Sequence, residues 1–389
     1  MTELRATPAG RLAIVGAGVI GLSCAWRAAE AGWAVELVDP APGSGSSWVA
    51  GGMLAPVTEA WPGEEDLLEL GADSLGRWPA FAAALAGAAG TPAGLRTEGT
   101  VVVAAGAGDR AELDDLAAYL AKVGREVDVL SARELRRLEP AIGPDVRGGL
   151  SVPGDLAVDN RVLLAALRAA ADRAGVRFVE AGARTVDTDG VELADGRRVP
   201  ADAVLVAAGA HSAALHPALD GLVRPVKGEI LRLRHRPGAL PPPRRTVRAV
   251  VDGRPVYAVP RDGGGLVIGA TQYETGFDTE PTVGGVRDLL RDAERVLPGV
   301  AEYALVEAAA GLRPGTPDNL PLIGSLGGST GAAGPLVATG HGRNGMLLAP
   351  ITVAAVLALL AGEPVPAAAL VADPARLTRT TLTGPTARR

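Results

Sequence analysis

The sequence contains almost no cysteine. Cys24 is the single one among 389 residues, which excludes internal disulfides and cysteine-rich metal sites and fits a reducing compartment. Because Cys24 lies in an apolar stretch that we expect to be helical, we predict a small core residue rather than a reactive thiol. The histidines His211, His216 and His235 are scattered without metal-ligand or triad spacing, so we predict no metal site.

Basic surfaces and long apolar runs are lacking as well. The net charge is −6, and no basic run is interleaved with aromatic residues, which argues against a nucleic-acid partner. The N-terminal MTELRATPAGR has no apolar stretch behind a basic region, unlike a signal peptide. The longest uncharged run, 344–362, contains Pro350 and many alanines, which favours a buried helix over a membrane span. We therefore expect a cytoplasmic protein with no membrane partner.

The start of the chain predicts a βαβ unit. Residues 12–16 (LAIVG) are typical of a short buried strand, 19–31 of a helix and 34–39 of a second strand. The turn between the first strand and the helix is GAGVIG, and the second strand ends in Asp39. This order of strand, glycine-rich turn, helix and acidic residue is typical of dinucleotide-binding folds.

Each residue of that motif has a physical role. Gly16 allows the tight turn, Gly18 lets the backbone approach a pyrophosphate, and Gly21 lets the helix pack closely on the strand. The free N–H groups at the start of the helix would bind phosphate. Asp39 would accept a hydrogen bond from a ribose hydroxyl, a role that does not distinguish NAD from FAD. The alternative is a glycine-rich turn in another α/β fold.

The loop after the second strand favours FAD. Its polar and small residues are placed to close over a pyrophosphate and a flavin, although each serine could also serve only as a turn former. These residues are Ser46, Ser47, Gly51, Gly52 and Met53. No second G-x-G-x-x-G occurs downstream. Reductases fed by NAD(P)H commonly have one, so we expect the electrons to come from the substrate.

The rest of the chain alternates between βαβ-like segments and strand-rich segments. A helix at 160–174 and strands near 176–180, 184–193 and 202–209 form a second βαβ-like stretch, whereas 222–275 is rich in strands and includes a predicted hairpin (VYAVP, RDGGG, LVIGAT). We predict an α/β fold in which a Rossmann-like FAD-binding domain is interleaved with a β-rich substrate-binding domain. The predicted boundaries are 11–88, 151–222 and 318–372 for the FAD-binding domain, 89–150 and 223–317 for the substrate-binding domain, and 1–10 and 373–389 for the tails.

Arg313 lies in the unusual run GLRPGTPDNLPLIG. Prolines and a glycine this close oppose a helix or a central strand, so we expect a stiff loop. A guanidinium held stiffly can grip a carboxylate through two parallel hydrogen bonds. The alternative is a surface arginine paired with a neighbouring acid.

Five segments together resemble a known family. They are VGAGVIGLSCAWRAAEAGWAVELVD, SSWVAGGMLAP, DAVLVAAGAHS, GLRPGTPDNLPLIG and GHGRNGMLLAP. In this order they resemble the D-amino-acid oxidase and sarcosine oxidase superfamily of FAD enzymes, and within it the glycine oxidases of thiamine biosynthesis. The resemblance runs from about residue 11 to residue 372.

The resemblance implies a cofactor site and a substrate site. The residues implied to contact FAD are Gly16, Gly18, Val19, Ile20, Gly21, Asp39, Pro40, Ser46, Ser47, Gly51, Gly52, Met53 and the run His341, Gly342, Arg343, Asn344, Gly345, Met346 and Leu347. Arg313 and Tyr257 would bind the substrate carboxylate, and Arg343 would project toward the substrate. Pro255 stands where some relatives carry a polar residue. Covalent attachment of FAD in this superfamily needs a cysteine near the flavin, so Cys24 as the single cysteine implies non-covalent FAD.

Two further readings concern residues near the flavin. A helix predicted at 345–360 would turn its positive end toward the flavin. Tyr257 could instead be half-buried for packing, and His341 could be only a turn residue, to which we assign no acid–base role. We assign no catalytic acid or base to any residue.

The implied reaction is the oxidation of free glycine or another small amine, with dioxygen as the electron acceptor. Thiazole synthase is a possible recipient of the product imine, and we expect a homo-oligomer. Three alternatives stay open: a D-amino-acid or sarcosine oxidase, a dehydrogenase that passes electrons to a quinone or carrier protein, and an FAD-binding protein without turnover.

Overall fold

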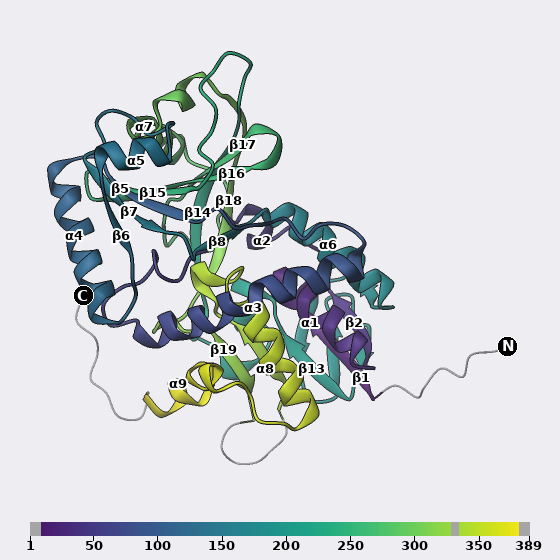
Figure 1. Cartoon of the computed structure of the whole chain (residues 1–389). Coiled ribbons are helices and arrows are strands. Elements are labelled where there is room, and N and C mark those ends of the chain that lie inside the picture. The colour runs from purple at the N-terminus through teal and green to yellow at the C-terminus, as the bar shows by residue number, and fades with distance from the viewer. Residues whose placement is uncertain (1–8, 328–333, 381–389) are drawn as a thin grey trace.

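The computed structural model describes residues 9–327 and 334–380, and it has two large sheets (Figure 1). The first is six-stranded, with the order β19-β20-β13-β1-β2-β9. Every pair is parallel except the edge pair of β19 and β20. The strands are β1 (Arg11–Val15), β2 (Ala34–Val38), β9 (Arg177–Val179), β13 (Ala203–Val206), β19 (Leu322–Ser325) and β20 (Leu336–Thr339). This arrangement confirms the predicted α/β class.

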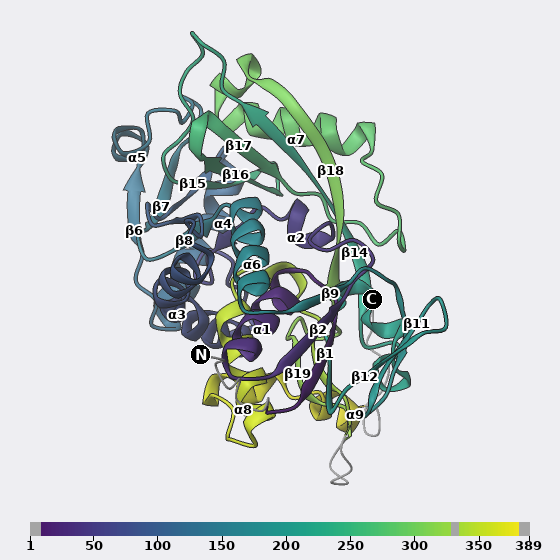
Figure 2. The ribbon, with the colours of Figure 1, turned by 90° about the vertical axis from the view of Figure 1, so that its right-hand side faces the viewer.

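Both faces of this sheet are covered, because successive side chains of a strand point to opposite faces. Leu12 and Ile14 face helices α1 (Val19–Glu30), α6 (Asn160–Arg173) and α8 (Ala349–Ala361), together with α3 (Glu65–Ala89). Ala13 and Val15 pack instead in a second core with the small antiparallel sheet of β10 (Ala183–Val186), β11 (Gly190–Leu193) and β12 (Arg198–Pro200). Figure 2 shows β11 and β12 on the side away from α1.

Cys24 lies inside the helical layer. Its side chain is fully buried on α1, in the same core as Trp26 and Trp78. Burial raises the pKa of the Cys24 thiol to about 12, so the thiol stays protonated at neutral pH. The predicted core role of Cys24 is confirmed. Among the described residues, no helix is long and apolar enough to cross a membrane.

The second large sheet has eight strands in the order β18-β14-β17-β16-β15-β5-β7-β6. The predicted hairpin is confirmed as β16 and β17, which pair in antiparallel fashion. Helix α7 (Val283–Val296) covers this sheet with Leu289, Ala293 and Val296. The strands are β5 (Thr100–Ala104), β6 (Asp128–Ser131), β7 (Gly148–Val152), β14 (Arg224–Arg234), β15 (Thr246–Val251), β16 (Arg254–Arg261), β17 (Gly265–Gly269) and β18 (Ala304–Gly315).

Smaller elements complete the described chain. A three-stranded sheet, β3-β8-β4, lies between the two large sheets. Its strands are β3 (Met53–Leu54), β8 (Leu156–Val158) and β4 (Leu95–Arg96), and the remaining α-helices are α2 (Ser46–Val49), α4 (Ala107–Lys122), α5 (Ala132–Leu138) and α9 (Ala375–Thr380).

Three local predictions need correction. The segment 184–193 is not one strand but β10 and β11, because Asp187 and Gly190 form the turn between them. The helix predicted at 345–360 begins at Ala349, next to Pro350, a residue that favours the first helical turn. Part of the predicted C-terminal tail is helical, since α9 is fixed by an ion pair between Arg376 and Asp318 at 2.8 Å. The predicted tail residues 1–8 and 381–389 lie outside the described residues.

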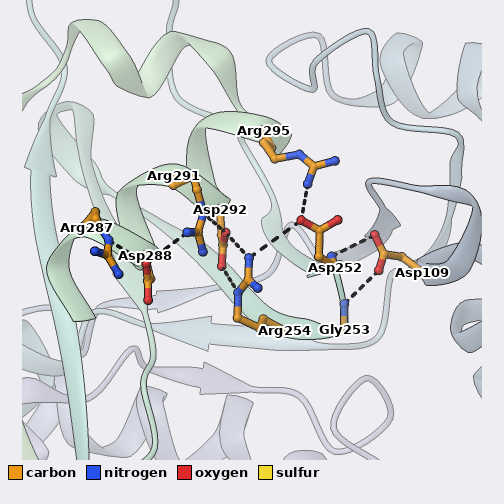
Figure 3. Close-up of polar contacts among 9 residues, drawn as sticks. All are labelled: Asp109, Asp252, Gly253, Arg254, Arg287, Asp288, Arg291, Asp292 and Arg295. Atoms are coloured by element: carbon orange, nitrogen blue, oxygen red, sulfur yellow. Dashed lines mark hydrogen bonds and ion pairs between the residues drawn. The ribbon is translucent and has the colours of Figure 1, made fainter. Parts of the chain in front are cut away.

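A network of arginines and aspartates fastens α7 to the turn between β15 and β16 (Figure 3). Arg254 donates two hydrogen bonds to Asp292, at 2.8 and 2.9 Å. Burial alone would raise the pKa of Asp292, but its bonds to Arg254 and Arg291 hold that pKa below the usual value. Asp109 of α4 accepts from the backbone N–H of Gly253 at 3.1 Å. The network therefore orients the two strands that carry Arg248 and Tyr257 into the site described next.

Candidate active site

A cavity of about 990 Å³ is lined by residues of both large sheets, which is at the upper end of the usual size for cofactor and ligand sites. Most of the predicted site residues line it. They are Gly16, Gly18, Val19, Ile20, Asp39, Pro40, Ser46, Ser47, Gly51, Gly52, Met53, Tyr257, Arg313, His341, Gly342, Arg343, Gly345 and Met346.

Three of the predicted cofactor residues do not line the cavity. A Cβ at Gly21 would lie 1.8 Å from the carbonyl oxygen of Gly16, so Gly21 serves the packing of α1 on the turn. Asn344 is buried, and its N–H donates to the His341 carbonyl at 2.9 Å. The Leu347 carbonyl accepts from Ser74 Oγ at 2.6 Å and from Trp78 Nε1 at 2.9 Å. Asn344 and Leu347 are both buried, and their backbone hydrogen bonds hold the turn in place.

The turn after β1 is built to hold an anion. Gly16 has a φ of 103°, and a Cβ there would lie 2.4 Å from the carbonyl oxygen of Ala207, so only glycine fits. The Ala17 N–H donates to Asp39 at 2.7 Å and the Val19 N–H to Ser47 Oγ at 3.0 Å. No acidic residue occupies the first turn of α1 itself, and the Asp39 carboxylate bonds to the turn before the helix, so the positive end of α1 can attract an anion. These residues fit the pyrophosphate of a dinucleotide.

The polar run after β2 is more rigid than its sequence indicates. Buried Asn160 donates to the carbonyls of Ser47 and Trp48, both at 2.8 Å, and buried Arg261 donates to the Gly51 carbonyl at 2.7 Å. Burial lowers the pKa of Arg261 to about 10, which leaves the guanidinium charged at neutral pH. These hydrogen bonds from α6 and β16 fix the backbone of the run.

Arg313 lies in a strand, contrary to the predicted loop. It belongs to β18, in which Pro314 stands opposite Pro225 of β14. Proline is tolerated there because β18 is the edge of the sheet, where a missing N–H interrupts no ladder on the open side. The guanidinium donates from Nη1 to the Thr271 carbonyl at 3.2 Å. Among the described residues, no carboxylate lies within 4.0 Å of it, so the alternative ion pair is absent there.

The Arg313 guanidinium lies in a slot over Gly228 of β14, a residue that has no side chain. A Cβ at Gly228 of β14 would lie 2.2 Å from Nη1 and 2.4 Å from Cζ of Arg313. The two neighbours of Gly228, Lys227 and Glu229, are buried. The Glu229 N–H donates to Thr271 Oγ1 at 2.9 Å, and the Lys227 ammonium binds Asp278. This triplet therefore provides the space for Arg313 and also fixes the segment whose Thr271 carbonyl accepts its hydrogen bond.

Tyr257 packs between two further glycines. A Cβ at Gly51 would lie 2.7 Å from its ring, and one at Gly269 would lie 2.2 Å from its hydroxyl oxygen. Burial raises the pKa of Tyr257, an effect that the charge of Arg313 partly opposes. The hydroxyl is therefore a neutral donor at physiological pH. In residues 9–327 and 334–380 it has no hydrogen-bond partner, so it is available to a ligand in the cavity.

Sequence reasoning missed an ion pair in the cavity wall. Arg248 Nη1 lies 2.6 Å from Glu59 Oε1, and their side chains are only 17% and 12% exposed. The signal for Arg248 was a charged residue in the apolar strand TVRAVV. Arg343, which we expected to project toward the substrate, pairs with Glu64 at 2.6 Å and donates to the Glu59 carbonyl at 3.3 Å.

Two buried titratable groups lie near the cavity. His341 Nε2 lies 3.0 Å from Thr352 Oγ1, and burial lowers the pKa of His341 to about 3, so the imidazole is neutral. Asp155 is fully buried; its Oδ2 accepts from Thr58 Oγ1 at 2.8 Å, while Oδ1 has no hydrogen-bond partner among the residues that the structure describes. Burial raises the pKa of Asp155 to about 7. Neither group combines solvent access with a charged partner, as a catalytic acid or base would.

The fold and the cavity together define an FAD-dependent oxidoreductase. The chain belongs to the FAD dependent oxidoreductase family, whose model matches residues 11–359. It is 34% identical over 352 residues to a glycine oxidase of Geobacillus kaustophilus, covering 88% of this chain and 90% of that protein. It is 32% identical over 342 residues to a putative thiamine biosynthesis oxidoreductase of Rhizobium etli, covering 87% of this chain and 93% of that protein.

A solved structure agrees with these matches. The crystal structure of glycine oxidase from Geobacillus kaustophilus superimposes with a TM-score of 0.84 at 31% identity, covering 94% of this chain and 98% of that one. The family resemblance inferred from the five sequence segments is confirmed.

Proposed function

We propose that this protein is an FAD-dependent oxidase of free glycine that also accepts other small amines such as sarcosine or D-alanine, with imine or glyoxylate, ammonia and hydrogen peroxide as products. The observation that carries the proposal is the Arg313 guanidinium, which lies in a glycine-lined slot without a carboxylate partner among the described residues. A charged group left in this way inside a cavity fits an anionic ligand. The neutral Tyr257 hydroxyl supplies a second donor.

Bound FAD would supply the oxidising chemistry, which is removal of a hydride from the substrate carbon. The chain's own contribution is positioning. Arg313 and Tyr257 bind the carboxylate, and the β1–α1 turn with Ser47 and Asp39 binds the dinucleotide. No protein base is required when the amine binds neutral, which agrees with His341 being uncharged and bonded to Thr352. Non-covalent FAD is supported by the burial of Cys24 in the core of α1.

Anaerobic titration of the purified flavoprotein tests this function. Free glycine, sarcosine, D-alanine and D-proline are added in turn, and the flavin absorbance near 450 nm is followed. We expect bleaching by free glycine and return of the colour in air with release of peroxide. Bleaching by D-proline alone would favour a D-amino-acid oxidase, slow return of the colour a dehydrogenase, and no bleaching by any of them a protein without turnover.

The biological setting is part of the proposal. The name of the Rhizobium etli relative supports a role in thiamine biosynthesis, in which thiazole synthase would receive the imine. We also propose a cytoplasmic homo-oligomer and the two interleaved domains with the boundaries given above. All six strands of the first sheet lie within the ranges proposed for the FAD-binding domain, whereas the boundary at 150/151 falls inside β7.

Gly228→Ala is expected to damage substrate binding while sparing the cofactor. The added methyl group would lie within 2.5 Å of three atoms of the Arg313 guanidinium, so the guanidinium must move. A misplacement of about 1 Å can cost on the order of 100-fold in rate, and we expect a loss of that order in kcat/KM for free glycine. Gly284→Ala on α7, with nothing within 4 Å of the new Cβ, is the control. Equal kinetics for the two variants would contradict the slot.

A further inference from the structure

We propose that Glu59 determines substrate specificity by occupying Arg248, so that the cavity offers one guanidinium and accepts amines with one carboxylate. This inference rests on the proposed function and adds its substrate class. Without Glu59, Arg248 becomes a second carboxylate-binding group, and the same site takes dicarboxylic amines.

Arg248 lies on the substrate-binding wall. It stands directly opposite Tyr257 in the antiparallel pair of β15 and β16, and residues opposite each other in such a pair place their side chains on one face of the sheet. Both residues line the cavity. Arg313, Glu59, Arg261 and Arg248 all act on the pKa of Tyr257 through their charges, so Glu59 and Arg248 lie within electrostatic reach of its hydroxyl.

Three of the four arginines that line the cavity pair with a carboxylate. Of the four arginines that line the cavity, Arg184 pairs with Glu192 at 3.2 Å, Arg248 with Glu59 at 2.6 Å and Arg343 with Glu64 at 2.6 Å. Of these four arginines, only Arg313 has no carboxylate partner among the described residues. One open guanidinium matches a substrate with one carboxylate.

Glu59 is held in place on both sides. Arg343 donates to its backbone carbonyl at 3.3 Å, and the preceding residue, Thr58, donates to buried Asp155 at 2.8 Å. A second substrate carboxylate would therefore meet a fixed negative charge, which disfavours binding. Replacing Glu59 by glutamine removes this repulsion and leaves Arg248 without a counter-ion. A buried charge without a partner is costly, so a second carboxylate at this position would be favoured.

The test compares free glycine with iminodiacetate in the holoenzyme. Iminodiacetate, with one molecule each of dioxygen and water, would give glyoxylate, free glycine and hydrogen peroxide, because one CH–NH unit loses a hydride and a proton and the imine is hydrolysed. For Glu59→Gln we expect the ratio of kcat/KM for iminodiacetate to that for free glycine to rise by about 10- to 100-fold. Glu59→Asp, which keeps the charge but retracts it by one methylene, is expected to change the ratio less, in the same direction.

The Glu59→Gln/Arg248→Met double variant is the control. It lacks the guanidinium, so we expect the ratio to return to within a few-fold of the wild-type value. An unchanged ratio in FAD-loaded Glu59→Gln, or a gain that persists in the double variant, would overturn the proposal. Wild-type turnover of free glycine is measured in parallel. Its absence refutes the proposed function, whereas the change in iminodiacetate affinity, read from the flavin spectrum, still reports on Glu59.

Discussion

Arg313→Ala is expected to retain bound FAD and to lose about 2–5 kcal/mol of substrate binding, which corresponds to about 30- to 4,000-fold in affinity for free glycine. The substrate carboxylate would then enter the cavity without its charged partner. Tyr257 alone offers a neutral hydrogen bond, which is weaker than a charge-assisted pair. The loss therefore affects KM and the anaerobic dissociation constant, whereas the absorbance of bound FAD keeps its wild-type intensity.

The matched control for this prediction is Arg234→Ala. Arg234 is an exposed arginine at the end of the neighbouring strand β14, outside the cavity. We expect wild-type kinetics for this variant. An Arg313→Ala protein with unchanged apparent affinity for free glycine would refute the role of Arg313 as carboxylate ligand, even if its turnover were slower.

Asp155→Asn is expected to stabilise the protein at alkaline pH. The folded-state pKa of Asp155 is about 7, against an ordinary value of 3.8, so the unfolded chain ionises this group first. The wild-type free energy of unfolding therefore decreases as the pH rises from about 4 to about 7. Asparagine does not titrate, so the variant avoids this loss, which amounts to at most about 4 kcal/mol at 1.36 kcal/mol per pH unit.

Urea unfolding of holoenzyme at pH 5, 6, 7 and 8 measures this effect. The new amide nitrogen also replaces one carboxylate oxygen and adds an offset that does not depend on pH, so the test is the slope of the difference between variant and wild type. We expect that difference to grow with pH up to about 7 and then to level off. Asp145→Asn, at a solvent-exposed position, serves as the control. A constant difference between Asp155→Asn and wild type would contradict the prediction.

Local sequence was sufficient for the dinucleotide half of the fold. The turn that includes Gly16, Gly18 and Gly21 depends on contacts within a few residues and one neighbouring strand, so its sequence pattern predicts its geometry. Arg313 shows where local rules fail. Its prolines and glycine excluded a central strand correctly, but β18 is an edge strand, and edge position depends on the order of the whole sheet.

The ion pair of Glu59 and Arg248 could not be predicted from sequence. The two residues are 189 positions apart, and their contact depends on how β15 packs beside the loop after β3. The Gly228 slot has the same origin, since nothing near Gly228 in the sequence indicates which side chain will cross it. The start of α8 was misplaced for a local reason, because alanine and leucine continue the helical pattern upstream of Pro350 and hide the turn at Gly342–Asn344.

The contacts that hold Arg313 link ligand binding to the way the protein unfolds. These contacts come from β14, β18 and the segment after β17, whereas the wall that would hold the dinucleotide comes from β1, α1 and the loop after β2. The substrate is held by the β-rich half and the dinucleotide by the other half, so both fill the cavity that the two large sheets line. Opening of either half would release the ligand that it binds, so each ligand stabilises the folded protein. Thermal unfolding of the loaded enzyme should therefore be a single cooperative event, and the empty protein should open first at the β-rich half.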